Sequence, residues 1–190
     1  MKSILAGLLA LAISVPAAFA GEIGDRAAEA EKLLQSGDTA GALEKFRGAE
    51  DALWQAMPLA ILNVHQVETA EGFGIYTERA SHAYKPGDEI ILYMEPVGYG
   101  YGSDGLGNKV IELSVDFTIF SESGEKLGTI DKVSRVQVAS RSRNRELFFK
   151  LNLSLNADGL PPGKYRADFI MHDENSGKKA PFTTDFEVAG

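Results

Sequence analysis

The 190-residue sequence contains no cysteine. Without cysteine there is no disulfide, no thiolate nucleophile, no cysteine-ligated zinc and no lipid-modified cysteine. Positive charge is also scarce, because 19 Lys and Arg residues face 27 Asp and Glu residues and leave a formal net charge of −8. So acidic a chain lacks the cationic field that phosphate groups require, which argues against nucleic acid and anionic membrane surfaces as partners.

The sequence also lacks the common catalytic motifs, such as G-x-S-x-G, the phosphate loop and H-E-x-x-H. Five side chains have the chemistry of a copper site, namely His65, His82, His172, Met94 and Met171. No ligand-like spacing links them, and adjacent residues in a strand, such as Met171 and His172, face opposite sides. We therefore expect no metal, no cofactor and no catalytic residue.

The first 20 residues have the pattern of a secretory signal peptide. Lys2 precedes an apolar run from Ile4 to Val15, and the small-residue ending Ala18-Phe19-Ala20 follows. The run has about 12 residues, fewer than the roughly 20 that a membrane-spanning helix needs. We expect cleavage near Ala20 and a mature bacterial protein that is periplasmic or secreted and not embedded in a membrane.

The composition changes at Pro58. Residues 21–57 are rich in Ala, Glu, Leu and Lys, whereas later residues alternate between β-branched or aromatic and polar types. This change predicts a helical hairpin over residues 21–58 and a β domain over residues 59–190. The two helices are expected at about Asp25–Gln35 and Thr39–Met57, separated by a turn at Gly37.

The segment GDTAGALEKFRGAEDAL resembles the second half of a tetratricopeptide repeat. Ala42, Phe46 and Ala49 match the small–large–small positions at which the paired helices of that repeat pack. The resemblance covers residues 25–57, one repeat, and no second copy follows. A solenoid needs about three repeats, so we expect a single hairpin that packs on a neighbouring domain or another subunit rather than a peptide-binding solenoid.

The β part has room for seven or eight strands. Three rows of alternating apolar residues are expected to face its interior: Ile111 to Ile119, Leu147 to Leu155, and Tyr165 to Met171. Sharp turns separate the strands and no helical pattern interrupts them, which favours an antiparallel sandwich. The predicted fold class is therefore mainly β, a β-sandwich preceded by a short α-helical hairpin.

Three short motifs resemble bacterial immunoglobulin-like sandwiches. Tyr84–Ile90 resembles the entry to their second strand, Leu160–Tyr165 the entry to their penultimate strand, and Asp173–Lys178 their final hairpin. The resemblance covers residues 84–188. It implies an immunoglobulin-like topology and carries no activity, because these motifs mark strand entries rather than chemistry.

Two segments are candidate binding sites. Pro96–Lys109 is a glycine-rich loop with Tyr99 and Tyr101, and it is longer than an ordinary hairpin loop. In an extended Gly-Tyr-Gly-Tyr-Gly run both rings would point to one side, about 7 Å apart, and with Tyr93 they would offer aromatic surface to a peptide or a sugar. The alternative is a structural connection between the sheets.

The second candidate is basic. Arg141, Arg143 and Arg145 alternate, so they share one face if the chain is extended there, and Arg135 lies nearby in the sequence. Guanidinium groups in this pattern suit an anionic partner, such as a carboxylate-rich glycan or the acidic face of another subunit. The alternative is a solvated segment that balances the many acids.

We therefore expect an exported, non-catalytic binding or scaffold protein of the bacterial cell envelope. Its partner would be a protein or glycan of the envelope, and a homo-oligomer is a further candidate. The alternative is a hydrolase of cell-envelope polymers that uses paired carboxylates. The carboxylates considered for that role are Glu68, Glu71, Asp88, Glu89 and Glu95.

Overall fold

The computed structural model describes residues 17–154 and 160–189. The chain divides after Met57 into two compact units, each described here by itself. Residues 1–16 of the predicted 20-residue signal peptide lie outside the described residues, and so does Leu155 of the second apolar row. In the part of the chain that is described, neither helix is both long and apolar enough to cross a membrane.

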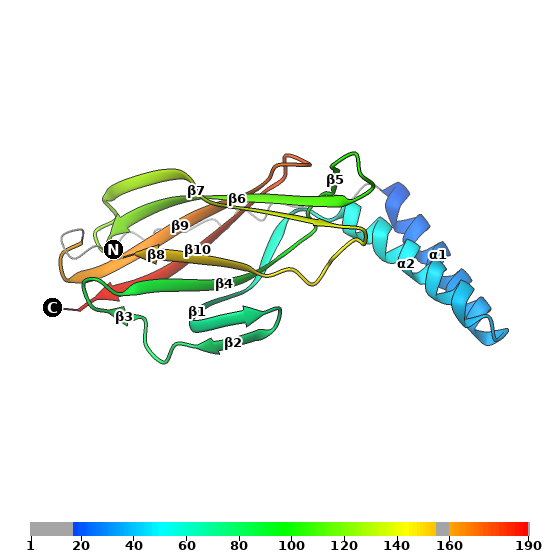
Figure 1. The fold of residues 1–190 in the computed structure, drawn as a ribbon, viewed down its shortest axis with the longest axis horizontal. Coiled ribbons are helices and arrows are strands. Elements are labelled where there is room, and N and C mark those ends of the chain that lie inside the picture. The colour runs from blue at the N-terminus through cyan, green and yellow to red at the C-terminus, as the bar shows by residue number, and fades with distance from the viewer. Residues whose placement is uncertain (1–16, 155–159, 190) are drawn as a thin grey trace, which may run out of the picture. The chain divides into compact units, whose positions relative to one another are not determined.

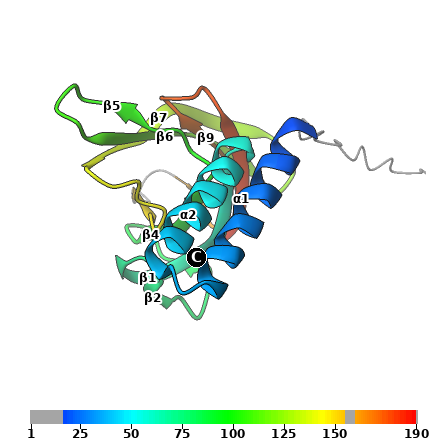
Figure 2. The same ribbon diagram turned by 90° about the vertical axis from the view of Figure 1, so that its right-hand side faces the viewer.

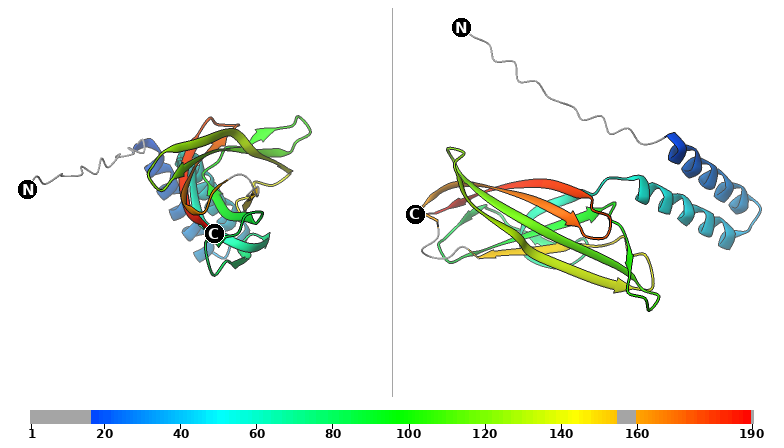
Figure 3. Two further views of the ribbon diagram at one scale, coloured as in Figure 1. Left: turned by 90° about the vertical axis from the view of Figure 1, so that its left-hand side faces the viewer. Right: turned by 90° about the horizontal axis from the view of Figure 1, so that it is seen from above.

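The first unit is the predicted helical hairpin. Helix α1 (Ala17–Gln35) and helix α2 (Thr39–Ala56) lie side by side and run in opposite directions (Figure 2, Figure 3). The Asp38 side chain caps α2 by accepting a bond from the Gly41 amide at 2.9 Å, and Gly37 takes the positive φ of the turn. Helix α1 begins before the expected Asp25, because alanine-rich sequence extends it back to Ala17.

The interior of the hairpin is built from alanine. The residues that are buried there are Ala30, Ala42, Ala49 and Ala52, whereas the large apolar side chains Leu34, Leu43, Phe46 and Leu53 are exposed. Phe46, which the repeat resemblance places between the helices, is 58% exposed, so that expectation is wrong. With alanines at the contact, Phe46 is left on the outside of α2.

The second unit is mainly β. Its strands in the described residues are β1 (Ala60–Gly72), β2 (Ile75–Glu78), β3 (Ala83–Tyr84), β4 (Glu89–Val97), β5 (Gly102–Ser103), β6 (Lys109–Ser121), β7 (Lys126–Ser140), β8 (Phe149–Ser154), β9 (Gly163–Asp173) and β10 (Lys179–Val188). They form one sheet in the order β2-β1-β4-β8 and another in the order β3-β10-β9-β6-β5, with β7 also paired to β6. The predicted fold class, a hairpin followed by a β-sandwich, is confirmed.

The two sheets form the layers of the sandwich, with β6, β7 and β9 in one and β1, β2 and β4 in the other (Figure 1). The described strand pairs are antiparallel except β3 with β10, which is parallel. Buried Gln66 of β1 joins the layers, because its amide donates to Thr184 Oγ1 at 2.8 Å and to the Asp185 carbonyl at 2.7 Å.

The core lies between the layers, where the expected rows meet. Leu113 and Val115 of β6 and Phe169 of β9 are buried, as the alternation predicts. Phe117 is only partly buried, but its ring packs 5.3 Å from that of Phe169. The outer face of β6 then carries Glu112, Ser114 and Asp116, which have a polar network of their own.

Candidate functional site

The glycine-rich loop between β4 and β5 is held in place by the β9–β10 turn. Buried Asp173 accepts a hydrogen bond from the Gly100 amide at 2.6 Å and another from Ser176 Oγ. Lys178 Nζ donates to the Gly98 carbonyl at 2.8 Å. Burial lowers the pKa of Lys178, and the nearby Asp173 carboxylate acts in the opposite direction. The loop is therefore an ordered part of the sandwich.

The glycines of this loop serve its packing. A Cβ on Gly102 would lie 2.4 Å from Asn175 Oδ1, and one on Gly100 would lie 3.0 Å from the Ser176 Cβ. These spaces are filled by the β9–β10 turn. The backbone at these two positions is therefore not open to a partner.

The two tyrosines of the loop meet at one acceptor. Tyr99 Oη donates to the Asn144 carbonyl at 2.7 Å, and Tyr101 Oη donates to the same carbonyl at 2.6 Å. Their rings pack edge to face with centroids 5.6 Å apart. Asn144 lies between Arg143 and Arg145, so the two segments that the sequence analysis selected separately form one site.

The tyrosines differ in exposure. Tyr99 is 1% exposed, whereas Tyr101 is partly exposed. The prediction of two rings standing free on one side is therefore wrong for Tyr99, because its hydroxyl reaches inward to Asn144. Burial and the adjacent Tyr101 raise the pKa of Tyr99 far above its ordinary value, so it stays a neutral donor.

Arg143 completes this site, and Arg141 lies two positions before it in the sequence. Arg141 and Arg143 are exposed and Arg145 is partly buried. The Arg143 guanidinium lies over the Tyr101 ring, 6.0 Å from its centroid. We call Tyr101, Arg141 and Arg143, with the Asn144 carbonyl and Tyr99 beneath them, the Tyr/Arg site. The expected role of Arg141, Arg143 and Arg145 in binding an anionic partner stays a prediction. Arg135 instead pairs with Glu112 on the outer face of β6 and β7.

Tyr93 belongs to a different cluster. Its side chain is fully buried on β4, its hydroxyl donates to Glu95 Oε1 at 2.5 Å, and its ring packs 4.3 Å from Tyr76 and 5.7 Å from Phe148. The Gly74 amide donates to the same hydroxyl at 2.7 Å. Tyr93 therefore links the β1–β2 turn to β4. The prediction that its ring is exposed for binding is wrong, because the ring is buried.

Two of the carboxylates considered for hydrolysis, Glu89 and Glu95, lie far apart along β4. Glu95 lies six positions along β4 from Glu89, roughly 20 Å at the rise of a strand. Asp88 caps the Lys85 amide at 2.8 Å, and Glu95 accepts from Tyr93 and from Asn63. Glu68 and Glu71 are exposed.

The histidines have separate surroundings. His65 pairs with Glu78 at 2.9 Å, and His172 pairs with Asp116 at 2.6 Å. Among the described residues, no group of three or more His, Asp or Glu side chains is arranged to hold a metal ion.

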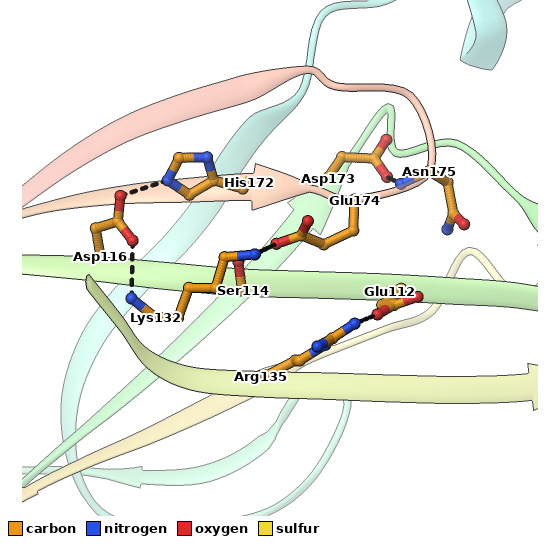
Figure 4. A network of polar contacts seen from close by, with 9 residues as sticks. All are labelled: Glu112, Ser114, Asp116, Lys132, Arg135, His172, Asp173, Glu174 and Asn175. Carbon is orange, nitrogen blue, oxygen red and sulfur yellow. Dashed lines mark hydrogen bonds and ion pairs between the residues drawn. The ribbon is translucent and has the colours of Figure 1, made fainter.

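Sequence reasoning missed a polar network on the outer face of β6, β7 and β9 (Figure 4). Asp116 accepts from the Lys132 amide at 2.9 Å and faces His172, and Ser114 Oγ donates to Glu174 Oε1 at 2.5 Å. Lys132 Nζ pairs with Glu174 at 2.9 Å. The only signal in the sequence was the polar half of the β6 alternation, which does not identify partners on other strands.

No protein-family model and no curated protein matches this sequence. The alkylpurine DNA glycosylase AlkC of Pseudomonas fluorescens is 11% identical, with 83% of this chain and 40% of that chain covered at a TM-score of 0.40. A family 123 glycoside hydrolase from Clostridium perfringens is 10% identical, with 70% and 28% covered at 0.39. This chain thus spans less than half the length of both enzymes, and similarities this weak carry no argument about family or function.

Proposed function

We propose that this protein is an exported, non-catalytic binding or scaffold protein of the bacterial cell envelope that binds a carboxylate-rich partner at the Tyr/Arg site. One observation carries the proposal: two tyrosine hydroxyls converge on the Asn144 carbonyl and hold the arginine-bearing segment in place. Holding the segment beforehand reduces the entropy that binding would otherwise cost. Export is supported by the signal-peptide pattern of the first 20 residues.

The charge of the site supports an anionic partner. Arg141 and Arg143 are exposed on a chain whose formal net charge is −8. A guanidinium binds a carboxylate through two parallel hydrogen bonds, and the exposed part of Tyr101 offers aromatic surface to a sugar ring. A uronic-acid polymer combines the two features. We therefore favour an acidic glycan over an acidic protein as the partner.

The test is titration of the purified protein with polygalacturonate, with uncharged dextran as the control polymer. We expect binding to polygalacturonate alone, and an affinity that falls as salt is raised. The paired change Arg141→Gln and Arg143→Gln should weaken binding at least tenfold. The change Lys126→Gln with Lys164→Gln removes the same charge from exposed positions elsewhere and should have little effect.

Three results would count against the proposal. Equal binding to dextran would show that charge is not recognised. Equal losses in the arginine and lysine variants would show that only the net charge of the protein matters. Absence of polygalacturonate binding, followed by recovery of an acidic envelope protein on the immobilised wild-type chain but not on the arginine variant, would assign the site to a protein partner instead.

A further inference from the structure

The exposed apolar side chains of α2 form a continuous row. Leu43, Phe46 and Leu53 are 49%, 58% and 47% exposed, and Glu50 occupies the remaining position of the three–four–three spacing. At 3.6 residues per turn this spacing puts all four on one face of the helix. We call this row the α2 seam. It has the pattern of a coiled-coil seam in which one core position is acidic.

The α2 seam is separate from the contact between the two helices. That contact uses the neighbouring row, in which Ala42 and Ala49 are 7% and 4% exposed. Ala42 immediately precedes Leu43, and Ala49 immediately precedes Glu50. The row of alanines therefore lies beside the seam on the surface of α2. A second helix could therefore pack on the seam while the hairpin stays intact.

We propose that the α2 seam binds the α2 seam of a second copy of this chain, with the two helices antiparallel. Leu43 and Leu53 lie at equal distances on either side of Gly48, as Phe46 and Glu50 do nearer to it. A two-fold axis at Gly48 therefore places Leu43 against Leu53 of the partner subunit, twice. Such self-complementarity is what a two-fold symmetric interface requires.

Charge selects the antiparallel arrangement. In a parallel pair, Glu50 would face Glu50 of the partner subunit within the seam, and two like charges in a core position repel. In the antiparallel pair, the two Glu50 side chains are separated along the helix. Each then lies next to the exposed Arg47 of the partner subunit, which has the opposite charge. The antiparallel orientation thus brings opposite charges together, whereas the parallel one brings like charges together.

The size of the seam sets the strength of the dimer. Helix α2 has 18 residues and so a length of about 27 Å, which gives a contact at the lower end of stable interfaces. The dimer should therefore dissociate on dilution, with a dissociation constant of about 1–100 µM. This inference concerns the helical unit and does not depend on the Tyr/Arg site.

Sedimentation velocity of the full chain, purified as a bacterial host processes it, measures the equilibrium. We expect a shift from monomer to dimer between about 1 µM and about 500 µM. Leu53→Asp should weaken the dimer at least tenfold. Leu106→Asp makes the same change at a leucine that is 76% exposed in the β unit, and it should have no effect. A monomer at every concentration would overturn the proposal, even if the seam binds something other than a second copy of this chain.

The absence of cysteine makes the orientation directly testable. Leu43→Cys and Leu53→Cys are prepared as separate proteins. Unlike Leu53→Asp, neither variant places a charge in the seam. On oxidation each variant alone should stay uncrosslinked, and an equal mixture should give a disulfide-linked dimer, because a disulfide requires Cα atoms within about 7 Å. Efficient crosslinking of either variant alone, or none in the mixture, would contradict the antiparallel register.

Discussion

Asp116 of β6 accepts a hydrogen bond from the backbone amide of Lys132 at 2.9 Å, in the middle of a bulge in β7. The register passes from Val115 opposite Ser134 to Phe117 opposite Ile130, so residues 131–133 together face Asp116. Lys132 has a φ of 48°, a conformation that costs energy for a residue with a side chain. The carboxylate thus stabilises an irregular segment of a long edge strand, where a bulge hinders pairing with other chains.

Replacing Asp116 by Ala should lower the free energy of unfolding by about 1–3 kcal/mol, because the Lys132 amide and His172 both lose their acceptor. Chemical denaturation measures the loss. Asp131→Ala, at an exposed neighbour in the same bulge, is the control and should cost far less. Equal losses would mean that the charge of the bulge, not the bond to Lys132, provides the stability.

The stability lost in Asp116→Ala should also depend on pH. The Lys132 amide, and to a smaller extent His172, lowers the pKa of Asp116 below its ordinary value of 3.8. A lowered pKa means that the stabilisation is complete above 3.8 and is lost as the pH falls below it. The difference in unfolding free energy between wild type and Asp116→Ala should therefore shrink in that range, and a constant difference would contradict this assignment.

Changing Tyr99 and Tyr101 together to Phe should weaken polygalacturonate binding although no charge is removed. The Asn144 carbonyl would lose both donors, and the arginine segment would lose the contacts that position it. Each lost hydrogen bond should cost about 0.5–1.5 kcal/mol of stability. Tyr165→Phe removes a hydroxyl bonded to the Pro161 carbonyl and serves as the control, with unchanged binding.

Tyr99 also separates the two interpretations of the loop. With the ring 1% exposed, Tyr99→Ala should cost about 3–5 kcal/mol, as truncation of a core aromatic residue does. If the variant unfolds at the same denaturant concentration as wild type, the ring is not part of the core and the loop is free to bind.

Periodicity was sufficient to predict most of the β unit. In β9, Tyr165, Ala167, Phe169 and Met171 are buried and alternate with Arg166, Asp168 and the exposed Ile170, so the interior row is the expected one. This works because strand geometry is local: alternate side chains face opposite sides whatever the partner strands are. The break at Pro58 is equally local, since it is a change of composition.

The candidate site was less predictable because its contacts are long-range. Tyr99 and Asn144 are 45 positions apart, and Gly100 and Asp173 are 73 apart. Nothing within the Gly-Tyr-Gly-Tyr-Gly run indicates that a distant carbonyl draws one ring inward. The prediction for Phe46 failed for a related reason: its position on α2 fits a repeat, but the fully buried residues of the described hairpin are alanines.

The raised pKa of Tyr93 predicts a loss of stability in alkaline solution. Burial, followed by the hydrogen bond to Glu95, raises its pKa from 10.0 to about 12. A raised pKa means that the stabilisation is complete below 10.0 and is lost as the pH rises toward about 12. Thermal unfolding of wild type and Tyr93→Phe at several pH values isolates this residue from the other tyrosines. The difference between the two proteins should change across this range, and parallel curves would contradict the assignment.

Gly102 should be replaceable only when Asn175 is removed as well. A Cβ at Gly102 would lie 2.4 Å from Asn175 Oδ1, so the amide must move and lose its bond of 3.0 Å to the Val110 carbonyl. Gly102→Ala should therefore cost about 1–3 kcal/mol. In an Asn175→Ala background the clash is absent, and the same change should cost less than about 1 kcal/mol.

Gly128 provides the matched control for Gly102. It also lies in a strand, and the nearest atom to an added Cβ there is Ile119 Cγ2 at 3.9 Å, an ordinary contact. Gly128→Ala should therefore be close to neutral in both backgrounds. Denaturation of the four combinations of Gly102 and Asn175 variants yields the coupling energy between the two sites. Strict additivity would show that the β9–β10 turn does not press on the glycine-rich loop, and the packing reason for glycine at this position would be wrong.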